Sequence, residues 1–253
     1  MESQTNALWF RTVCLQNGLQ LSDAMLEQFE AFVGLLKEWN AKINLISRRD
    51  EESIWSAHIL HSVSILLKLN IPLNSRVLDL GTGGGLPGLP LKIARPDLHI
   101  TLLDSTQKKI NVVNEVVRSM NLTGAQAVWG RAEELGKQPE FSKKYDISVA
   151  RAVAPLKDLV RWSVPFLKPQ RKADGKSNQH PSSKKMEIVP PAIVALKGGD
   201  LDQEIRQAKS LSTIKSIEVV HLTLEGSNQL EEGEKRIVVV NPQHTHERKT
   251  GKQ

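Results

Sequence analysis

The chain has 253 residues, of which 40% are hydrophobic and 25% charged, a composition typical of ordinary soluble domains. It excludes global disorder, and because no apolar run approaches the ~18 residues of a membrane-spanning helix, it also argues against a membrane protein. The N-terminal stretch "MESQTNALWFRTVCLQNG" has no basic segment leading into an apolar one, so we expect a cytoplasmic protein. Cys14 is the only cysteine, which excludes an intramolecular disulfide and a cysteine-rich zinc site.

The formal charge of +6 at pH 7 is distributed unevenly along the chain. The positive excess falls in two polar segments, 168–185 and 244–253, and the remainder is close to neutral. Both segments lack the apolar residues needed to form a core, so we predict a mobile basic loop at 168–190 and a disordered basic tail at 244–253. Charge in such segments is weak support for an RNA-binding face.

Residues 1–72 are predicted to form a helical lobe that packs on the core. In "LSDAMLEQFEAFVGLLKEWN" the large apolar residues recur at steps of three and four, which places them on one helical stripe: Met25, Phe29, Phe32, Leu36 and Trp39. Ser22 is a suitable N-cap for this helix. A second helix is expected from near Asp50 to just before Pro72. We interpret the aromatic stripe as core rather than as a platform for stacking bases.

From Arg76 onward the pattern changes to short apolar strands that alternate with helical stretches, and we assign 73–243 to a second domain. Repeated strand and helix units build a mostly parallel α/β sheet. The last two strands, "KSIEVVHLTL" and "KRIVVV", are separated only by a polar turn that is too short for a crossover helix, so they should pair antiparallel. A seven-stranded sheet with such an ending resembles the Rossmann-like fold of S-adenosylmethionine-dependent methyltransferases.

A glycine loop, "LDLGTGGGLPGLPL", follows the first predicted strand of this sheet. Gly83, Gly85 and Gly88 satisfy the pattern G-x-G-x-x-G between a strand and a helix, and Asp104 follows at the end of the next strand. A carboxylate in that position can bind the two hydroxyls of a ribose. The motif taken alone supports a nicotinamide dinucleotide as well as S-adenosylmethionine.

Asp79 favours S-adenosylmethionine over the dinucleotide. A carboxylate just ahead of the loop would oppose a pyrophosphate, whereas it would attract the ammonium and sulfonium of S-adenosylmethionine. The only tyrosine, Tyr145, has Val149 rather than a lysine four residues later, so a Tyr-x-x-x-Lys hydride-transfer site is absent. The alternative for Asp79 is a structural one, in which its side chain caps the backbone of the loop.

Six segments together resemble the bacterial small-subunit ribosomal RNA guanine-N7 methyltransferase G family, also called glucose-inhibited division protein B. They occur in the family's order and spacing between about Leu19 and Val240: "WNAKINLISRRDEESIWSAHILHS", "VLDLGTGGGLPGLPL", "TLLDSTQKK", "GRAEEL", "VARAVAPL" and "ALKGG". The chain departs from the family at His61, where an aspartate is usual, and in the longer segment 168–190.

The resemblance implies a set of cofactor contacts at the carboxyl ends of the predicted strands. In addition to Asp79 and Gly83, it assigns this role to Gly81, Leu86, Asp104, Ser105, Thr106, Ala132, Glu133 and Arg151. We also select Arg151 and Lys197 as candidate catalytic residues, because either could hold guanine O6 or a phosphate at the mouth of the pocket. Arg131 is a third candidate. A surface salt bridge is the alternative for Lys197, and a contact to the cofactor alone is the alternative for Arg151.

The implied reaction is methyl transfer from S-adenosylmethionine to guanine N7 in 16S ribosomal RNA, with the RNA or a ribosomal subunit precursor as partner. N7 has a lone pair and no proton, so the reaction needs alignment rather than a general base. Another RNA or a small molecule as the methyl acceptor, and a catalytically idle RNA-binding protein, remain alternatives. We expect a monomer. We also expect no metal, because the histidine pairs His58/His61 and His244/His246 lack a third ligand beside them.

Overall fold

The structure is a computed structural model that describes residues 2–169 and 185–243. The basic tail expected at 244–253 and most of the loop expected at 168–190 lie outside the described residues. None of the described helices combines the length and the apolar character that crossing a bilayer requires.

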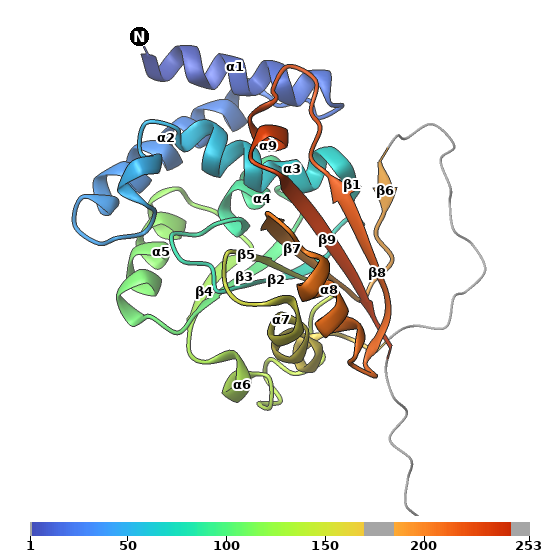
Figure 1. Cartoon of the computed structure of the whole chain (residues 1–253). Helices are drawn as coiled ribbons and strands as arrows, with labels where there is room; N and C mark the ends of the chain where they lie inside the picture. Colours follow the sequence, from blue (N-terminus) through green and yellow to red (C-terminus); the bar gives the residue numbers. More distant parts are fainter. Residues whose placement is uncertain (1, 170–184, 244–253) are drawn as a thin grey trace, which may run out of the picture.

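A seven-stranded sheet forms the centre of the described part of the chain (Figure 1). Its strands stand in the order β4-β3-β2-β5-β7-β9-β8. Five of them run parallel, and β9 pairs antiparallel with both β7 and β8. The strands are β2 (Arg76–Leu80), β3 (His99–Asp104), β4 (Ala125–Trp129), β5 (Ile147–Arg151), β7 (Ala192–Gly198), β8 (Ile214–His221) and β9 (Lys235–Pro242). The predicted sheet with its antiparallel final pair is therefore confirmed.

The chain order of the sheet reverses at β2, which lies between β3 on one side and β5 on the other. In open α/β sheets a crevice opens beyond the carboxyl ends of the strands at such a reversal, because the connections leave in opposite directions. The glycine loop follows β2 directly, so the fold places it in this crevice. The same edge receives the residues that end β3 and β5.

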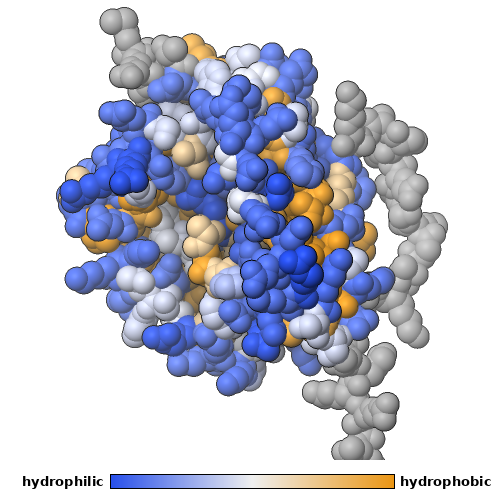
Figure 2. All heavy atoms as spheres, viewed as in Figure 1, coloured by the Kyte–Doolittle hydropathy of each residue, from blue (hydrophilic) through white to orange (hydrophobic). Residues whose placement is uncertain are grey.

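Helices cover both faces of the sheet and enclose two apolar clusters (Figure 1). One cluster lies under the N-terminal helices, α4 (Gly88–Ala94) and α5 (Gln107–Ser119). The other lies under α7 (Leu156–Ser163) and α8 (Asp202–Lys209), near the short α6 (Ala132–Leu135) and a 3-10 turn, Val164–Phe166. On the face shown in Figure 2, hydrophilic residues cover most of the surface and separate the apolar ones into small groups.

The N-terminal lobe packs α1 (Glu2–Gln16) and α2 (Asp23–Asn40) against the helices of the sheet. The Ser22 side chain accepts a hydrogen bond from Met25 N at 3.2 Å, which confirms the predicted N-cap. The aromatic stripe of α2 is core, as expected: Phe29 and Phe32 are fully buried, and Trp39 lies half-buried at the margin.

The single helix expected from Asp50 to Pro72 is divided into shorter elements. A 3-10 turn (Arg48–Asp50) is followed by a π-helical segment (Ile54–Leu60), α3 (His61–Lys68) and a two-residue strand, β1 (Leu69–Asn70). A π-helical segment is wider than an α-helix and is frequent at functional sites.

The C-terminal end of the expected 168–190 loop is ordered, and the prediction is wrong there. Met186–Glu187 form β6, which pairs in parallel with β1, and Ile188 is buried. Lys185 Nζ donates to Gly18 O at 3.1 Å and to Leu66 O at 2.9 Å. The aliphatic Ile188 and these backbone contacts anchor the segment to the N-terminal lobe.

The connection between β8 and β9 also attaches to the N-terminal lobe. It carries a one-turn helix, α9 (Gln229–Glu232), whose Leu230 is buried and which packs on the π-helical segment. Lys68 Nζ donates to Thr223 O at 2.5 Å. A turn that the sequence presents as polar therefore brings the antiparallel pair against residues 54–60.

Candidate cofactor and substrate site

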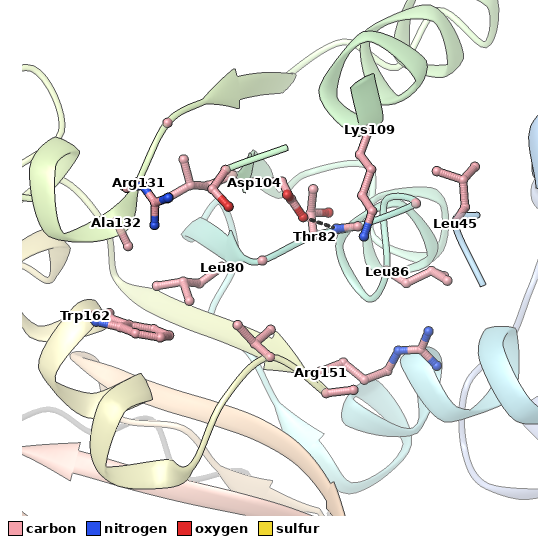
Figure 3. Close-up of a pocket in the computed structure, with 18 of the residues that line it drawn as sticks. Leu45, Leu80, Thr82, Leu86, Asp104, Lys109, Arg131, Ala132, Arg151 and Trp162 are labelled. Atoms are coloured by element: carbon pink, nitrogen blue, oxygen red, sulfur yellow. Dashed lines mark hydrogen bonds between the residues drawn. The ribbon is translucent and has the colours of Figure 1, made fainter. Parts of the chain in front are cut away.

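A cavity of about 490 Å³ opens at the carboxyl ends of β2, β3, β4 and β5 (Figure 3). We call it the first cavity. It is lined by the glycine loop, by the residues that follow these strands and by one residue of the N-terminal lobe: Leu45, Leu80–Gly84, Leu86, Leu103–Ser105, Lys109, Gly130–Glu133, Arg151–Val153 and Trp162. Of the expected cofactor contacts, all except Asp79 and Thr106 line it.

The glycine loop presents bare backbone to the first cavity. Gly81, Gly83 and Gly85 have φ angles of +72°, +55° and +89°, a region that side chains with a Cβ avoid. Gly81 N and Thr82 N both donate to Leu103 O, at 2.8 and 2.9 Å, which attaches the loop to β3. A Cβ at Gly83 would meet no protein atom within 4 Å, so the space beside this residue belongs to the cavity.

Asp79 lies beneath the loop and not in the first cavity. Its side chain is fully buried, and Oδ2 accepts hydrogen bonds from Thr82 Oγ1 at 2.5 Å and from Gly88 N at 2.8 Å. The expectation that this carboxylate attracts the cofactor directly is therefore corrected in favour of the structural alternative. Asp79 caps the loop and the start of α4, and so it shapes the cavity from behind.

Burial raises the pKa of the Asp79 carboxyl from its ordinary 3.8 to about 7, although the hydrogen bonds from Thr82 and Gly88 lower it. The folded state then binds a proton between pH 4 and 7 that the unfolded chain has released, so Asp79 lowers the stability of the fold as pH rises through this window. We expect the free energy of unfolding of Asp79→Asn, relative to the natural protein, to increase from pH 4 to pH 7 and to level off above. Denaturant unfolding at several pH values measures this difference, and a constant difference would contradict the raised pKa.

Gly88 is required by close packing between α4 and β3. A Cβ there would lie 2.4 Å from Leu102 Cδ2 and 2.7 Å from Asp79 Oδ2, both in the buried core. We expect Gly88→Ala to destabilise the protein by about 1–3 kcal/mol, the usual cost of overpacking. Gly34→Ala is the matched control. Gly34 is an exposed residue of α2 with no atom within 4 Å of the new Cβ, so the change should stabilise the protein by up to about 1 kcal/mol. Chemical denaturation of both variants tests the contrast.

Asp104 ends β3 with its carboxylate on the wall of the first cavity. Oδ2 accepts from Gly83 N at 2.9 Å and Oδ1 accepts from Thr106 N at 2.8 Å, so the carboxylate is fixed by the two backbones that flank it. Each oxygen retains a second lone pair for a ligand hydroxyl. Ser105 lines the cavity next to it, whereas Thr106 is exposed outside the lining, where it precedes α5.

The residues after β4 form the next part of the wall. Ala132 and Glu133 begin α6, where the first amides of a helix have no partner within the helix, and Arg131 precedes them. Trp162 from α7 completes this side of the cavity (Figure 3). The indole gives an apolar surface suited to a planar ring.

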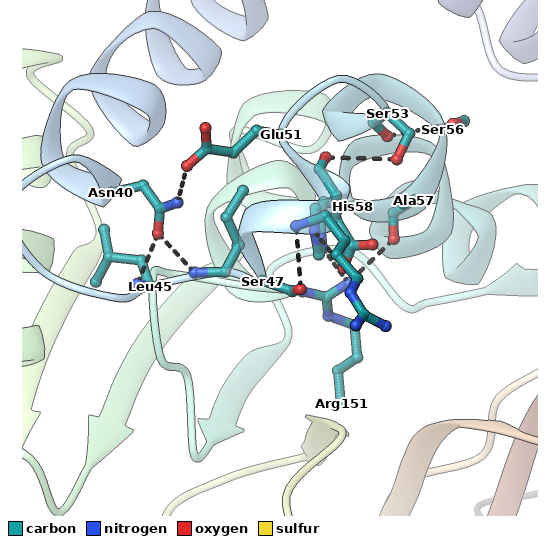
Figure 4. A network of polar contacts seen from close by, with 12 residues as sticks. Asn40, Leu45, Ser47, Glu51, Ser53, Ser56, Ala57, His58 and Arg151 are labelled. Atoms are coloured by element: carbon teal, nitrogen blue, oxygen red, sulfur yellow. Dashed lines mark hydrogen bonds and ion pairs between the residues drawn. The ribbon is translucent and has the colours of Figure 1, made fainter.

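Arg151 ends β5 and lies between the sheet and the N-terminal lobe (Figure 4). Its Nη1 lies 3.2 Å from Ala57 O and 2.8 Å from His58 Nδ1. Burial lowers the pKa of Arg151 to about 10, while the carboxylates of Asp79 and Asp50 oppose this shift, so the side chain stays cationic at neutral pH. This places a partly buried positive charge on the wall of the first cavity.

Lys197 does not reach the first cavity. Its ammonium is paired with Glu204 of α8 and donates to Ala154 O at 2.6 Å. Glu204 also accepts from Leu156 N, so the ion pair joins β7 to the starts of α7 and α8. Lys197 thus forms a partly buried salt bridge rather than a surface one, and it lines a neighbouring cavity that also includes Arg151.

Among the residues of the first cavity that the sequence did not single out are Leu45, Lys109 and Trp162. Leu45 is positioned by buried Asn40, whose Oδ1 accepts from Leu45 N at 2.8 Å and Ile46 N at 2.9 Å (Figure 4). A buried asparagine at the end of an apolar helix was a usable signal for this turn. Lys109 and Trp162 lie on α5 and α7, whose sequences contain no motif that marks these positions. They face the cavity because of how the two helices pack on the sheet.

No group of three or more histidine, cysteine, aspartate or glutamate side chains suited to a metal is found within residues 2–169 and 185–243. His58 and His61 are both buried, and His58 Nδ1 lies within hydrogen-bond distance of Arg151 Nη1. His244 and His246 lie outside the described residues.

The first cavity suits S-adenosylmethionine. Asp104 presents a carboxylate where a ribose diol would bind, the glycine loop allows backbone to approach the ligand closely, and Trp162 offers a face for the adenine.

The fold agrees with this cofactor. An O-methyltransferase of Bacillus cereus in complex with SAH aligns with a TM-score of 0.50 at 14% identity, over 83% of this chain and 90% of that one. A predicted O-methyltransferase of Agrobacterium tumefaciens aligns with a TM-score of 0.51 at 11% identity, over 75% and 82%. Fold and site define the class of S-adenosylmethionine-dependent methyltransferases.

The particular family follows from sequence comparisons. A family model described as rRNA small subunit methyltransferase G matches residues 25–173. Relatives named ribosomal RNA small subunit methyltransferase G include the proteins of Caldanaerobacter subterraneus, 36% identical over 78% of this chain and 74% of that protein, and of Streptococcus agalactiae, 33% identical over 91% and 88%. That of Moorella thermoacetica is 39% identical over 60% of this chain, and the match spans 63% of that protein, less than two thirds. The chain belongs to the rRNA small subunit methyltransferase G family.

Proposed function

We propose that this protein transfers a methyl group from S-adenosylmethionine to N7 of a guanine in 16S ribosomal RNA. One observation carries the proposal: the segment that matches the family, 25–173, contains the glycine loop, Asp104 and Arg151, and all three line one cavity. We also propose that it acts as a cytoplasmic monomer, on the RNA itself or on a precursor of the small ribosomal subunit.

Different residues of the first cavity would bind different parts of the cofactor and the base. Gly81, Gly83 and Leu86 would contact the methionine and ribose parts, Asp104 and Ser105 the ribose, and Ala132 and Glu133 the adenine through their amides. When bound, S-adenosylmethionine supplies a methyl group activated by a sulfonium. Arg151 would position the base at the edge of the cavity.

The side chains around the cavity agree with an attack that needs no proton transfer. Of the side chains that line it, the carboxylates of Asp104 and Glu133 could accept a proton, but Asp104 is already bound by two backbone amides and Glu133 is exposed on the wall. Guanine N7 attacks with a free lone pair, so the rate depends on alignment of N7, methyl carbon and sulfur and on exclusion of water. A methyl acceptor with a hydroxyl or amine would require a base as well.

Mass mapping of ribosomal RNA from cells with and without the gene tests the proposal. We expect one 7-methylguanosine of the small-subunit RNA to be lost without the gene and to be restored by the purified protein. Loss of a methyl group at another atom would contradict the guanine-N7 assignment. An unchanged RNA, with S-adenosylmethionine still bound by the protein, would indicate a different methyl acceptor.

A further inference from the structure

A second cavity, of about 660 Å³, lies on the opposite side of Arg151 from the first. The π-helical segment and the 3-10 turn before it form one wall, and the other comes from the ends of β7 and β9 with α9 between β8 and β9. Arg151 and Ala152 line both cavities, so they form the boundary between them. Ala152 has a φ of +53°, a strained conformation for a residue with a Cβ, and such strain concentrates at functional sites.

Arg151 fixes the tautomer of His58 in the wall of this second cavity. A guanidinium has only donors, so its 2.8 Å contact to His58 Nδ1 requires that Nδ1 be the acceptor. Burial and the neighbouring Arg151 lower the pKa of His58 to about 4, although Asp50 opposes this, so the ring is neutral at pH 7. The single ring proton therefore resides on Nε2, which is buried and has no hydrogen-bond partner among the described residues.

The carboxylate of Asp50 lies beside this proton. Asp50 Oδ2 lies 3.5 Å from His58 Nε2, a long contact, and the Asp50 side chain is 41% exposed. A fixed donor thus stands beside a carboxylate in one cavity. Guanine presents the complementary edge, with O6 as acceptor next to N1–H as donor, whereas adenine presents an amino donor next to a bare nitrogen.

Two further side chains of the second cavity support a nucleotide as its occupant. His61 is 6% exposed, and its Nε2 also lacks a partner among residues 2–169 and 185–243. Burial, Arg151 and Lys235 lower the pKa of His61 to about 3, so it too is neutral. Lys235, at the start of β9, lines the same cavity with no ion pair to the described residues and offers a cation for a phosphate.

We propose that the second cavity receives the target guanosine, with His58 Nε2–H donating to O6, Asp50 accepting from N1–H and Lys235 facing a phosphate. The inference rests on the proposed function and adds to it the residues that distinguish guanine from adenine. Arg151 is a positioning residue in this arrangement, because it holds His58 in the donor tautomer at the boundary with the first cavity. O6 is then bound on the N1 side, and N7 stays free for the methyl group.

Calorimetric titration of the full chain, loaded with S-adenosylhomocysteine, with GMP and with AMP tests the proposal without turnover. We expect the natural protein to prefer GMP by roughly 10- to 100-fold, the range for a well-formed pair of base contacts. His58→Asn keeps an acceptor for Arg151 but loses the Nε2 donor, so the preference should fall to near one. His58→Gln places an amide donor near the Nε2 position and should retain most of it.

Two controls separate base recognition from general damage. Lys235→Gln should lower the affinities for GMP and for AMP by the same factor. His221→Asn, a change at an exposed histidine on β8, should leave both affinities unchanged. All variants should bind S-adenosylhomocysteine as the natural protein does. Equal affinity of the natural protein for GMP and AMP, no binding of GMP up to its solubility limit, or an undiminished preference in His58→Asn would each overturn the inference. A guanine preference in a protein that leaves ribosomal RNA unmethylated would instead refute only the proposed function.

Discussion

Arg151→Ala should lose on the order of 100-fold in the rate of methyl transfer, because misplacing the reacting base by about 1 Å has an effect of this size. Cofactor affinity should fall much less, since Arg151 is one of many residues that line the first cavity. The change removes the contacts to Ala57 O and His58 Nδ1 and frees His58 to take either tautomer. The rate of a single turnover on ribosomal RNA from cells lacking the gene, and the dissociation constant of S-adenosylmethionine, are measured on the same preparation.

Two comparisons make the Arg151 result interpretable. Arg131→Ala removes an exposed arginine from the mouth of the first cavity and should have a smaller effect on the rate. Arg151→Lys keeps a positive charge but cannot provide the planar fork of donors, so it should restore only part of the rate. Equal losses of rate and cofactor affinity in Arg151→Ala would reduce this residue to a contact with the cofactor.

Asp104→Ala should weaken S-adenosylmethionine binding by about 1.5–3 kcal/mol, the usual cost of a lost hydrogen bond to a charged group. This corresponds to roughly 10- to 100-fold in the dissociation constant. The carboxylate also holds Gly83 N and Thr106 N, so the variant should lose some stability as well. Calorimetry gives the affinity, and denaturant unfolding gives the stability.

Glu133→Ala is the matched control for Asp104. Its side chain is exposed on the same wall of the cavity, and the contact expected from this position is made by the backbone amide. Its cofactor affinity should therefore stay close to that of the natural protein. An Asp104→Ala protein that is folded and binds S-adenosylmethionine with unchanged affinity would remove Asp104 from the cofactor site.

The sequence by itself determined the elements and much of the cofactor site. Local periodicity is enough to predict strands such as "HITLLD" and the buried stripe of α2, because the faces of a strand or helix repeat at fixed intervals. The glycine loop and Asp104 were also predictable, since a parallel sheet brings the ends of neighbouring strands to one edge. The polar turn between the last two strands likewise required their antiparallel pairing.

Only the tertiary structure decided what the charged and polar side chains do. Asp79 turns under the loop, Lys197 pairs with Glu204, and His58 is fixed by Arg151. The side chain of Glu204 and the hydrogen-bond donors to Asp79 lie within ten residues along the chain from Lys197 and Asp79, but these contacts form only because of how α8 and α4 pack on the sheet. His58 and Arg151 are distant in sequence, and the second cavity exists because the hairpin that carries α9 packs on the π-helical segment. The role of a charged residue thus depends on how the elements around it pack, and a local sequence pattern does not contain that information.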